Sequence, residues 1–284
     1  ALQDEIVKRV VVELQVKLTE GDRARVASRG TDNLEAWLLR IEAYGELTKF
    51  TREGMIRARE LYEAAHQADP GWSQPIASLA SIDWYEAKQG WRSPKEEAIR
   101  SGMALAQRAI QLDPEAPLGY QTLGNLYALS DQAERAIELR RKAAELAPND
   151  LFAVAGLATR LKDFGGEQEA VQLFEQAMRL SPKHQWWVPS AYGVALHLVG
   201  RKEEAIASFK KAIALKSNHV HPHAFLTAVY ADLGRIDEAK ATANKIMRLD
   251  PKFTATRFMQ SHSLHDPARD ARFKGLMLRA GLPE

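Results

Sequence analysis

The stretch Tyr120-Gln-Thr-Leu-Gly-Asn-Leu-Tyr127 is followed by Ala136, Ala143 and Pro148, and the same spacing of residue types returns three more times. Pro148 lies 34 residues after Pro114, and the interval stays at 34 or 35 residues to the end of the fourth copy. A fixed period of this length predicts a series of similar units, each of which buries its apolar face against its neighbours. The corresponding positions of the later copies are Val154, Leu157, Ala158, Leu161, Gly165, Ala170, Phe174, Ala177 and Pro182; then Tyr192, Gly193, Leu196, Gly200, Ala205, Phe209, Ala212 and Ser217; then Leu226, Tyr230, Gly234, Ala239, Ile246 and Pro251.

Small residues stand at two recurrent places in these copies. One is an alanine, which we expect where the two helices of a unit cross, because axes about 8–10 Å apart leave no room for larger side chains. The other is a glycine that ends the first helix, where a left-handed conformation turns the backbone back. Each copy is therefore predicted to be a pair of antiparallel helices. The alanines are Ala136, Ala170, Ala205 and Ala239, and the glycines are Gly165, Gly200 and Gly234.

The pattern predicts an all-α protein in which about six helix pairs form a right-handed superhelix, an α-solenoid. An amphipathic helix is expected before the array, within residues 1–32. A capping helix with Asp266 as its N-cap is expected after it, within residues 252–284. The second pair has ten extra residues, which we expect in a longer turn around Gln89–Pro94 because glycine and proline interrupt a helix there. The array spans residues 33–251, with pairs at approximately 33–70, 74–114, 117–148, 151–182, 186–217 and 220–251.

This 34-residue pattern resembles that of tetratricopeptide-repeat proteins over residues 33–251. Short segments near the two ends are similar to the repeat region that follows the catalytic domain in bacterial class III adenylate/guanylate cyclases. In those proteins the cyclase domain comes first, and the repeats are the regulatory or partner-binding part. Similar repeat tails occur in winged-helix transcription regulators, so the kind of domain joined to this sequence stays open. The segments are Leu2-Gln-Asp-Glu-Ile-Val7, Arg29-Gly-Thr-Asp-Asn33, Thr51-Arg-Glu-Gly54, Asp266-Pro267 and Ala280-Gly-Leu-Pro-Glu284.

The composition argues against several classes of function. The protein has 39 Lys and Arg against 37 Asp and Glu, a net charge of +2, so no direct binding of nucleic acid is predicted. It contains no cysteine, which removes disulfides, zinc-thiolate sites and cysteine nucleophiles and suits the reducing cytoplasm, where we expect the protein. No run of 18 apolar residues is present, so no membrane segment is predicted. The sequence begins at Ala1 rather than Met, from which we expect a domain of a longer protein, with a processed protein as the alternative.

No catalytic or cofactor-binding motif occurs in the sequence. It has no Gly-x-Gly-x-x-Gly, Gly-x-Ser-x-Gly or P-loop pattern, so the protein is predicted to be non-enzymatic and to need no cofactor. His219, His221 and His223 alternate, but no nearby carboxylate or cysteine completes a ligand set, and no metal site is predicted. Asn125 would need cationic neighbours to clamp a carboxylate, and only Lys162 stands at a comparable place one copy later.

The first helices of such an array line its concave side, where a peptide or helix of a partner protein can bind. Aromatic side chains on this wall would anchor the partner, although packing between repeats is an equally good interpretation of each of them. We predict a protein-interaction or scaffold module, the regulatory tail of a larger bacterial signalling protein. The alternatives are a segment of an adenylate/guanylate cyclase with an upstream catalytic domain and the sensor half of a transcription regulator. The partner and any homo-oligomer stay open. The predicted groove residues are Trp84, Tyr85, Gln121, Asn125, Phe152, Thr159, Lys162, Trp187, Val194 and His197.

Overall fold

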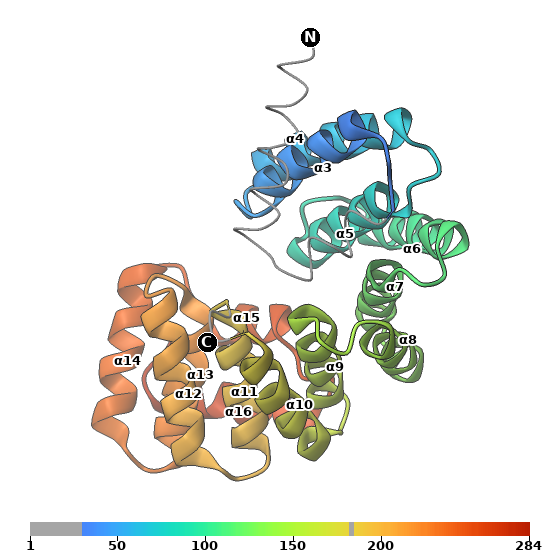
Figure 1. Ribbon diagram of the computed structural model, residues 1–284. Helices are drawn as coiled ribbons and strands as arrows, with labels where there is room; N and C mark the ends of the chain where they lie inside the picture. Colours follow the sequence, from blue (N-terminus) through green and yellow to red (C-terminus); the bar gives the residue numbers. More distant parts are fainter. Residues whose placement is uncertain (1–29, 182–184) are drawn as a thin grey trace. The chain divides into compact units, whose positions relative to one another are not determined.

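A computed structural model describes residues 30–181 and 185–284 of the protein. These residues form helices α3 to α16 and no strand, which confirms the predicted all-α fold class (Figure 1). The amphipathic helix expected before the array lies outside the described residues. The protein divides into two compact units, the first ending at Leu126 and the second running from Tyr127 to Glu284.

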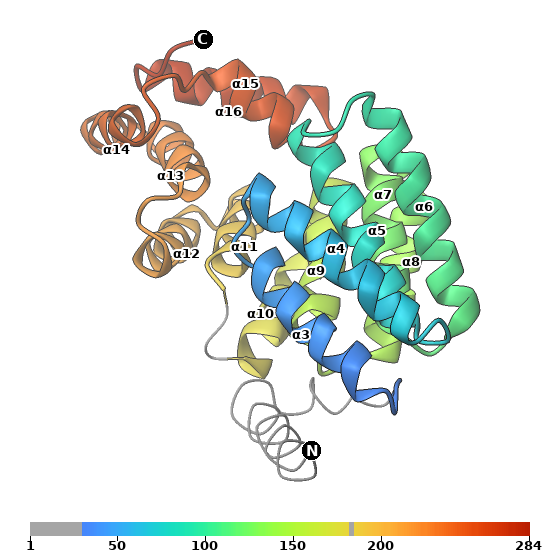
Figure 2. The ribbon, with the colours of Figure 1, turned by 90° about the horizontal axis from the view of Figure 1, so that it is seen from above.

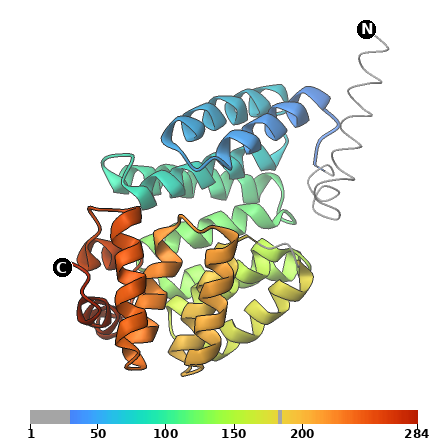
Figure 3. The ribbon, with the colours of Figure 1, turned by 90° about the vertical axis from the view of Figure 1, so that its left-hand side faces the viewer.

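The first unit contains two complete helix pairs and most of α7 (Figure 3). Two of its helices begin at N-caps: the Asn33 side chain accepts a hydrogen bond from the backbone N–H of Ala36, and the Thr51 side chain from that of Gly54, each at 3.0 Å. The extra length of the second pair lies mainly in its helices, which have 17 and 18 residues, rather than in the turn between them as expected. The helices are α3 (Leu34–Leu47), α4 (Arg52–Ala68), α5 (Ser73–Gln89), α6 (Lys95–Leu112) and α7 (Pro117–Leu129).

In the second unit, antiparallel helices follow one another side by side, as α11 to α14 do in Figure 2. The glycines that were expected to end first helices adopt positive φ angles, +96° at Gly165, +84° at Gly200 and +74° at Gly234. The alanines expected at helix crossings are fully buried. The helices are α8 (Ala133–Leu146), α9 (Leu151–Asp163), α10 (Glu167–Leu180), α11 (Trp187–Leu198), α12 (Lys202–Leu215), α13 (Val220–Asp232) and α14 (Ile236–Leu249).

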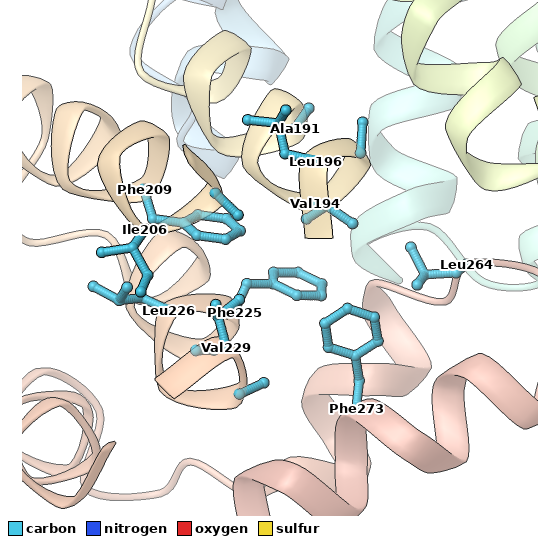
Figure 4. Packing of buried hydrophobic residues seen from close by; sticks show 14 of the residues in the cluster. Ala191, Val194, Leu196, Ile206, Phe209, Phe225, Leu226, Val229, Leu264 and Phe273 are labelled. Atoms are coloured by element: carbon cyan, nitrogen blue, oxygen red, sulfur yellow. The ribbon is translucent and has the colours of Figure 1, made fainter. Parts of the chain in front are cut away.

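Two further helices, α15 (Ala255–Ser261) and α16 (Pro267–Arg279), complete the second unit. The Asp266 carboxylate caps α16 as predicted and accepts hydrogen bonds from the backbone N–H groups of Ala268 and Arg269. The short helix α15 was not predicted. Figure 4 shows Phe225 of α13 between Phe209 of α12 and Phe273 of α16. Ring centroids lie 6.3 Å apart in the first pair and 5.2 Å apart in the second. The C-terminal helix therefore covers the apolar face of the last helix pair.

Candidate functional site

The ten predicted groove residues are divided between the two units. Four of them belong to α5 and α7 in the first unit: Trp84, Tyr85, Gln121 and Asn125. The other six belong to α9 and α11 in the second unit: Phe152, Thr159, Lys162, Trp187, Val194 and His197.

In the first unit, the two aromatic residues of α5 have different surroundings. The Tyr85 ring lies 5.7 Å from that of Phe50 and 5.5 Å from that of Trp91, and burial raises the pKa of its hydroxyl. The Trp84 ring is half-buried, with the Lys88 ammonium 5.5 Å from its centre. Tyr85 thus belongs to a packed aromatic cluster, and the Trp84 ring lies 6.2 Å from that of Tyr85 and also contacts the cation of its own helix.

On α7, Gln121 and Asn125 stand one helical turn apart, and both are half-buried. Beside them the hydroxyl of Thr122 lies 2.8 Å from that of Ser81 on α5, which ties the two helices together. The amide side chains therefore lie next to a fixed contact between first helices.

In the second unit, the rings of Phe152 and Trp187 lie 5.8 Å apart at the beginnings of α9 and α11. Both are half-buried, and the indole N–H of Trp187 donates a hydrogen bond to the amide oxygen of the Gln185 side chain at 3.2 Å. Thr159, two turns along α9, donates its hydroxyl to the carbonyl of Ala155. Adjacent first helices therefore present one aromatic pair with partly exposed rings.

Val194 and His197 do not line an open wall, because their side chains are only 1% and 5% exposed. The ring of Phe273 on α16 lies 5.0 Å from that of His197. Burial lowers the pKa of His197 to about 4, an effect only partly opposed by Asp232, whose Oδ2 lies 3.6 Å from Nε2. The C-terminal helix covers this part of the first helices. Val194 and His197 were predicted to line the groove, and the structure instead places both in the core.

Lys162 is also buried, and it belongs to a charged cluster on α9. Its ammonium pairs with Asp163, whose Oδ2 lies 3.0 Å from Nη2 of Arg160. Although burial opposes ionisation, the two cations hold the pKa of Asp163 below its ordinary value. The two cations and the Asp163 carboxylate thus stabilise one another at the C-terminal end of α9.

Arg140 of α8 is a candidate that the sequence reasoning did not single out. It is buried against Gly156 of α9, so close that a Cβ built on the glycine would lie 2.5 Å from Nη1. The signal was present in the repeat spacing, because the next two copies have Phe174 and Phe209 at the same place and the last copy has Ala243. A charged residue at a core position of a repeat is a departure that requires an explanation.

The three alternating histidines make different contacts, although the Trp186 ring lies near both His219 and His221. The ring of His219 lies 3.8 Å from that of Trp186, and burial together with Lys216 lowers its pKa to about 4. Nδ1 of His221 lies 2.9 Å from the Ser190 hydroxyl, and Nε2 of His223 lies 3.1 Å from a backbone carbonyl. Among the described residues, no group of three His, Cys, Asp or Glu side chains is placed to hold a metal ion.

Family models for the tetratricopeptide repeat match this protein at residues 119–150 and 196–260. A Rhizobium meliloti protein named as an adenylate cyclase is 33% identical over 141 residues, which span 48% of this protein and 24% of that one. The peroxisomal targeting signal receptor of Kluyveromyces lactis is 28% identical over 50% of this protein and 23% of its own length. The matches thus span about a quarter of the length of these two relatives.

Solved structures share the fold at low sequence identity. A protein of the APC/C hetero-tetramer Cut9-Hcn1 has a TM-score of 0.63 at 15% identity, covering 93% of this protein and 52% of that one. A tetratricopeptide-repeat protein from Parabacteroides merdae has a TM-score of 0.52 at 14% identity, covering 87% and 99%. None of the helices in the described ranges has the length and apolar character needed to cross a bilayer.

Proposed function

Because the protein has tetratricopeptide repeats, which generally serve as protein–protein interaction modules, we propose that it binds a segment of a partner protein at the aromatic pair of the second unit. The observation that carries the proposal is the Phe152–Trp187 pair, two large rings on adjacent first helices that remain partly exposed. Aromatic side chains of this kind anchor partners at a low cost in conformational entropy. A peptide or helix laid across the starts of α9 and α11 would bury both rings.

The other surfaces of the second unit suit this role less well. The far ends of α11 and α13 are covered by α16, which buries His197 beneath Phe273. Leu215 is exposed, but it lies at the end of α12, which is a second helix. The aromatic pair instead lies at the beginnings of two first helices. The starts of the first helices therefore offer the anchor residues that remain accessible.

We also propose that the protein works as the non-catalytic, regulatory part of a larger bacterial signalling protein. Its similarity to a protein named as an adenylate cyclase supports a cyclase as the attached domain, and the match covers 24% of that protein. The purified 284 residues should then turn over neither ATP nor GTP, whatever the attached domain does. Nucleotide turnover by these residues alone, absent from a matched preparation carrying a helix-breaking proline, would make the protein an enzyme instead.

Binding is tested by using residues 1–284 as bait, identifying what they capture, and then titrating that partner against purified variants. We expect Trp187→Ala and Phe152→Ala to weaken binding by about 2 kcal/mol or more, because anchor residues lose most on truncation. Leu215→Ala removes an exposed apolar group elsewhere in the same unit and serves as the matched control. Circular dichroism establishes that each variant is folded. If both aromatic variants bind as tightly as the parent, the binding surface lies elsewhere.

A further inference from the structure

The Arg140 guanidinium is buried, and the described residues provide no ion pair for it. It is 8% exposed, and its Nε has no hydrogen-bond partner within the described ranges. The next residue, Arg141, by contrast forms two hydrogen bonds with Glu169 at 2.7 and 3.1 Å. Burying a charge without a partner costs free energy that the fold must supply from other contacts.

Packing does not require an arginine at this place. In the next two repeats the same position holds Phe174 and Phe209, and each is fully buried against the next first helix. The room for the longer arginine comes from Gly156, because any larger side chain there would overlap the guanidinium. The Arg140–Gly156 contact therefore stands where the next repeats have an apolar contact. Because an apolar side chain could fill this position, packing alone does not explain why an arginine occurs here.

One cation and one carboxylate act on the Arg140 guanidinium. Arg160 lies one turn beyond Gly156 on α9, and burial together with this like charge lowers the pKa of Arg140 to about 9. Asp150 attracts it from the start of α9, and Asp163 is already shared by Arg160 and a buried lysine. An anion bound between Arg140 and Arg160 would relieve the repulsion between these two cations.

We propose that Arg140 and Arg160 bind a carboxylate of the partner segment, a step that rests on the binding function proposed above. Phe152, Gly156 and Arg160 follow one another at four-residue intervals and so share one stripe of α9. Two helical turns separate the aromatic anchor from Arg160, about 12 Å along the axis. The partner would therefore carry an acidic group about that distance from the residue that contacts Phe152.

A carboxylate fits this place better than a phosphate does. The guanidinium group is planar and matches the two oxygens of a carboxylate in a bidentate pair. Asp163 beside Arg160 would repel a doubly charged phosphate more strongly than a singly charged carboxylate. The net charge of the protein is only +2, so no wider field draws polyanions to this surface.

Nuclear magnetic resonance of the arginine Nε–Hε groups tests the proposal in the full 284-residue protein. Two small carboxylates are added separately: N-acetylglutamate α-amide, which carries the carboxylate of a glutamate residue, and N-acetylglycine, which mimics the free carboxylate at the end of a peptide. We expect the Arg140 signal to shift saturably with at least one of them, and the difference between the two identifies the source of the carboxylate. The Arg141 signal, from an exposed arginine already paired with Glu169, is the internal control.

Two variants separate a binding role from a structural one. Arg140→Met removes the charge, and Gly156→Ala keeps the charge but forces the guanidinium aside. For a captured partner we expect at least a tenfold loss of affinity with either variant, and none with Arg141→Met. No saturable shift, or equal shifts at Arg140 and Arg141, would overturn the carboxylate site. If only Trp187→Ala and Phe152→Ala weaken the partner, the proposed function stands and this inference fails.

Discussion

The second unit joins its consecutive helix pairs in two different ways. At the two later junctions an aromatic side chain fills the space: the Phe174 ring lies 6.0 Å from that of Tyr192, and Phe209 stacks at 6.3 Å on Phe225. At the earlier junction the equivalent residue is Arg140, which lies against Gly156. Helices pack against one another in all three cases, so the repeat tolerates opposite chemistry at one position.

This difference separates what the repeat needs from what it merely allows. A buried phenylalanine contributes transfer free energy and dispersion contacts to two neighbouring pairs at once. An arginine in its place contributes its aliphatic stem and carries an unpaired charge into the interior. A position that is apolar in three copies and charged in one is therefore a sign of selection for something other than stability.

The largest effect should come from emptying an apolar junction. Phe209→Ala leaves a cavity between α12 and α13, and truncating a buried phenylalanine typically costs about 3–5 kcal/mol. Urea unfolding followed by circular dichroism measures this loss of free energy. Leu215→Ala removes a side chain that is 51% exposed at the end of the same helix, and it should change stability by about 0.5 kcal/mol or less. Equal losses for the two variants would show that Phe209 does not fill the junction.

A second buried polar group, His197, should make the unit sensitive to acid. Burial lowers its folded pKa to about 4 against an ordinary value of 6.5, so as the pH falls the unfolded protein takes up the proton first. The stabilising contribution of the neutral ring is complete above pH 6.5 and lost between pH 6.5 and about 4, a change on the order of 3 kcal/mol.

The charged groups facing His197 are Asp232, which opposes the shift, and Arg272 and Lys202, which reinforce it. The unfolding free energies of the parent and of His197→Leu are measured from pH 7 to 4. The difference between them isolates the contribution of His197 to the pH dependence from that of His219, whose pKa is also lowered. The variant should lose less stability over this range than the parent. Parallel curves for the two proteins would mean that His197 is not the sensitive group.

A third variant tests the crossing within a pair rather than the junction between pairs. Ala205→Leu forces a larger side chain into a site that is 0% exposed, and overpacking of this kind typically costs about 1–3 kcal/mol. Hydrogen exchange should show faster opening mainly in α11 to α14, because an array transmits damage to its neighbours only. Ala207→Leu, two residues along the same helix and exposed, is the control and should leave exchange unchanged.

The sequence predicted those parts of the fold that follow from the regular spacing of the repeats. The alanine crossings, the left-handed glycines and the Asp266 cap all depend on residues close in sequence, where spacing and local propensity decide the outcome. The same spacing could not show α16 lying over His197, because that contact joins residues 197 and 273 through tertiary packing. It also placed the extra length of the second pair in a turn, although α5 and α6 contain it.

The candidate site was predictable in part for the same reason. Phe152 and Trp187 were identified as groove residues from the helix register, and the structure places their rings 5.8 Å apart. Arg140 was missed because first helices line the concave side of such an array, whereas this residue reaches α9 from a second helix. A buried residue that departs from the repeat pattern is more informative than one that follows it, because the other copies show which residue type is expected at that position.

The smallest effect should run in the opposite direction and is the sharpest test of the comparison. Arg140→Met replaces an unpaired buried charge with an apolar side chain, as the later junctions do, and exchanges of this kind are often stabilising. We expect the partner-free variant to gain about 1 kcal/mol, which for a unit of this size raises the unfolding temperature by about 2–4 °C. Arg141→Met removes an exposed pair with Glu169 and should lose at most about 1 kcal/mol. If Arg140→Met were instead the less stable of the two, the guanidinium would have acceptors within the fold, and the charge at this junction would be structural after all.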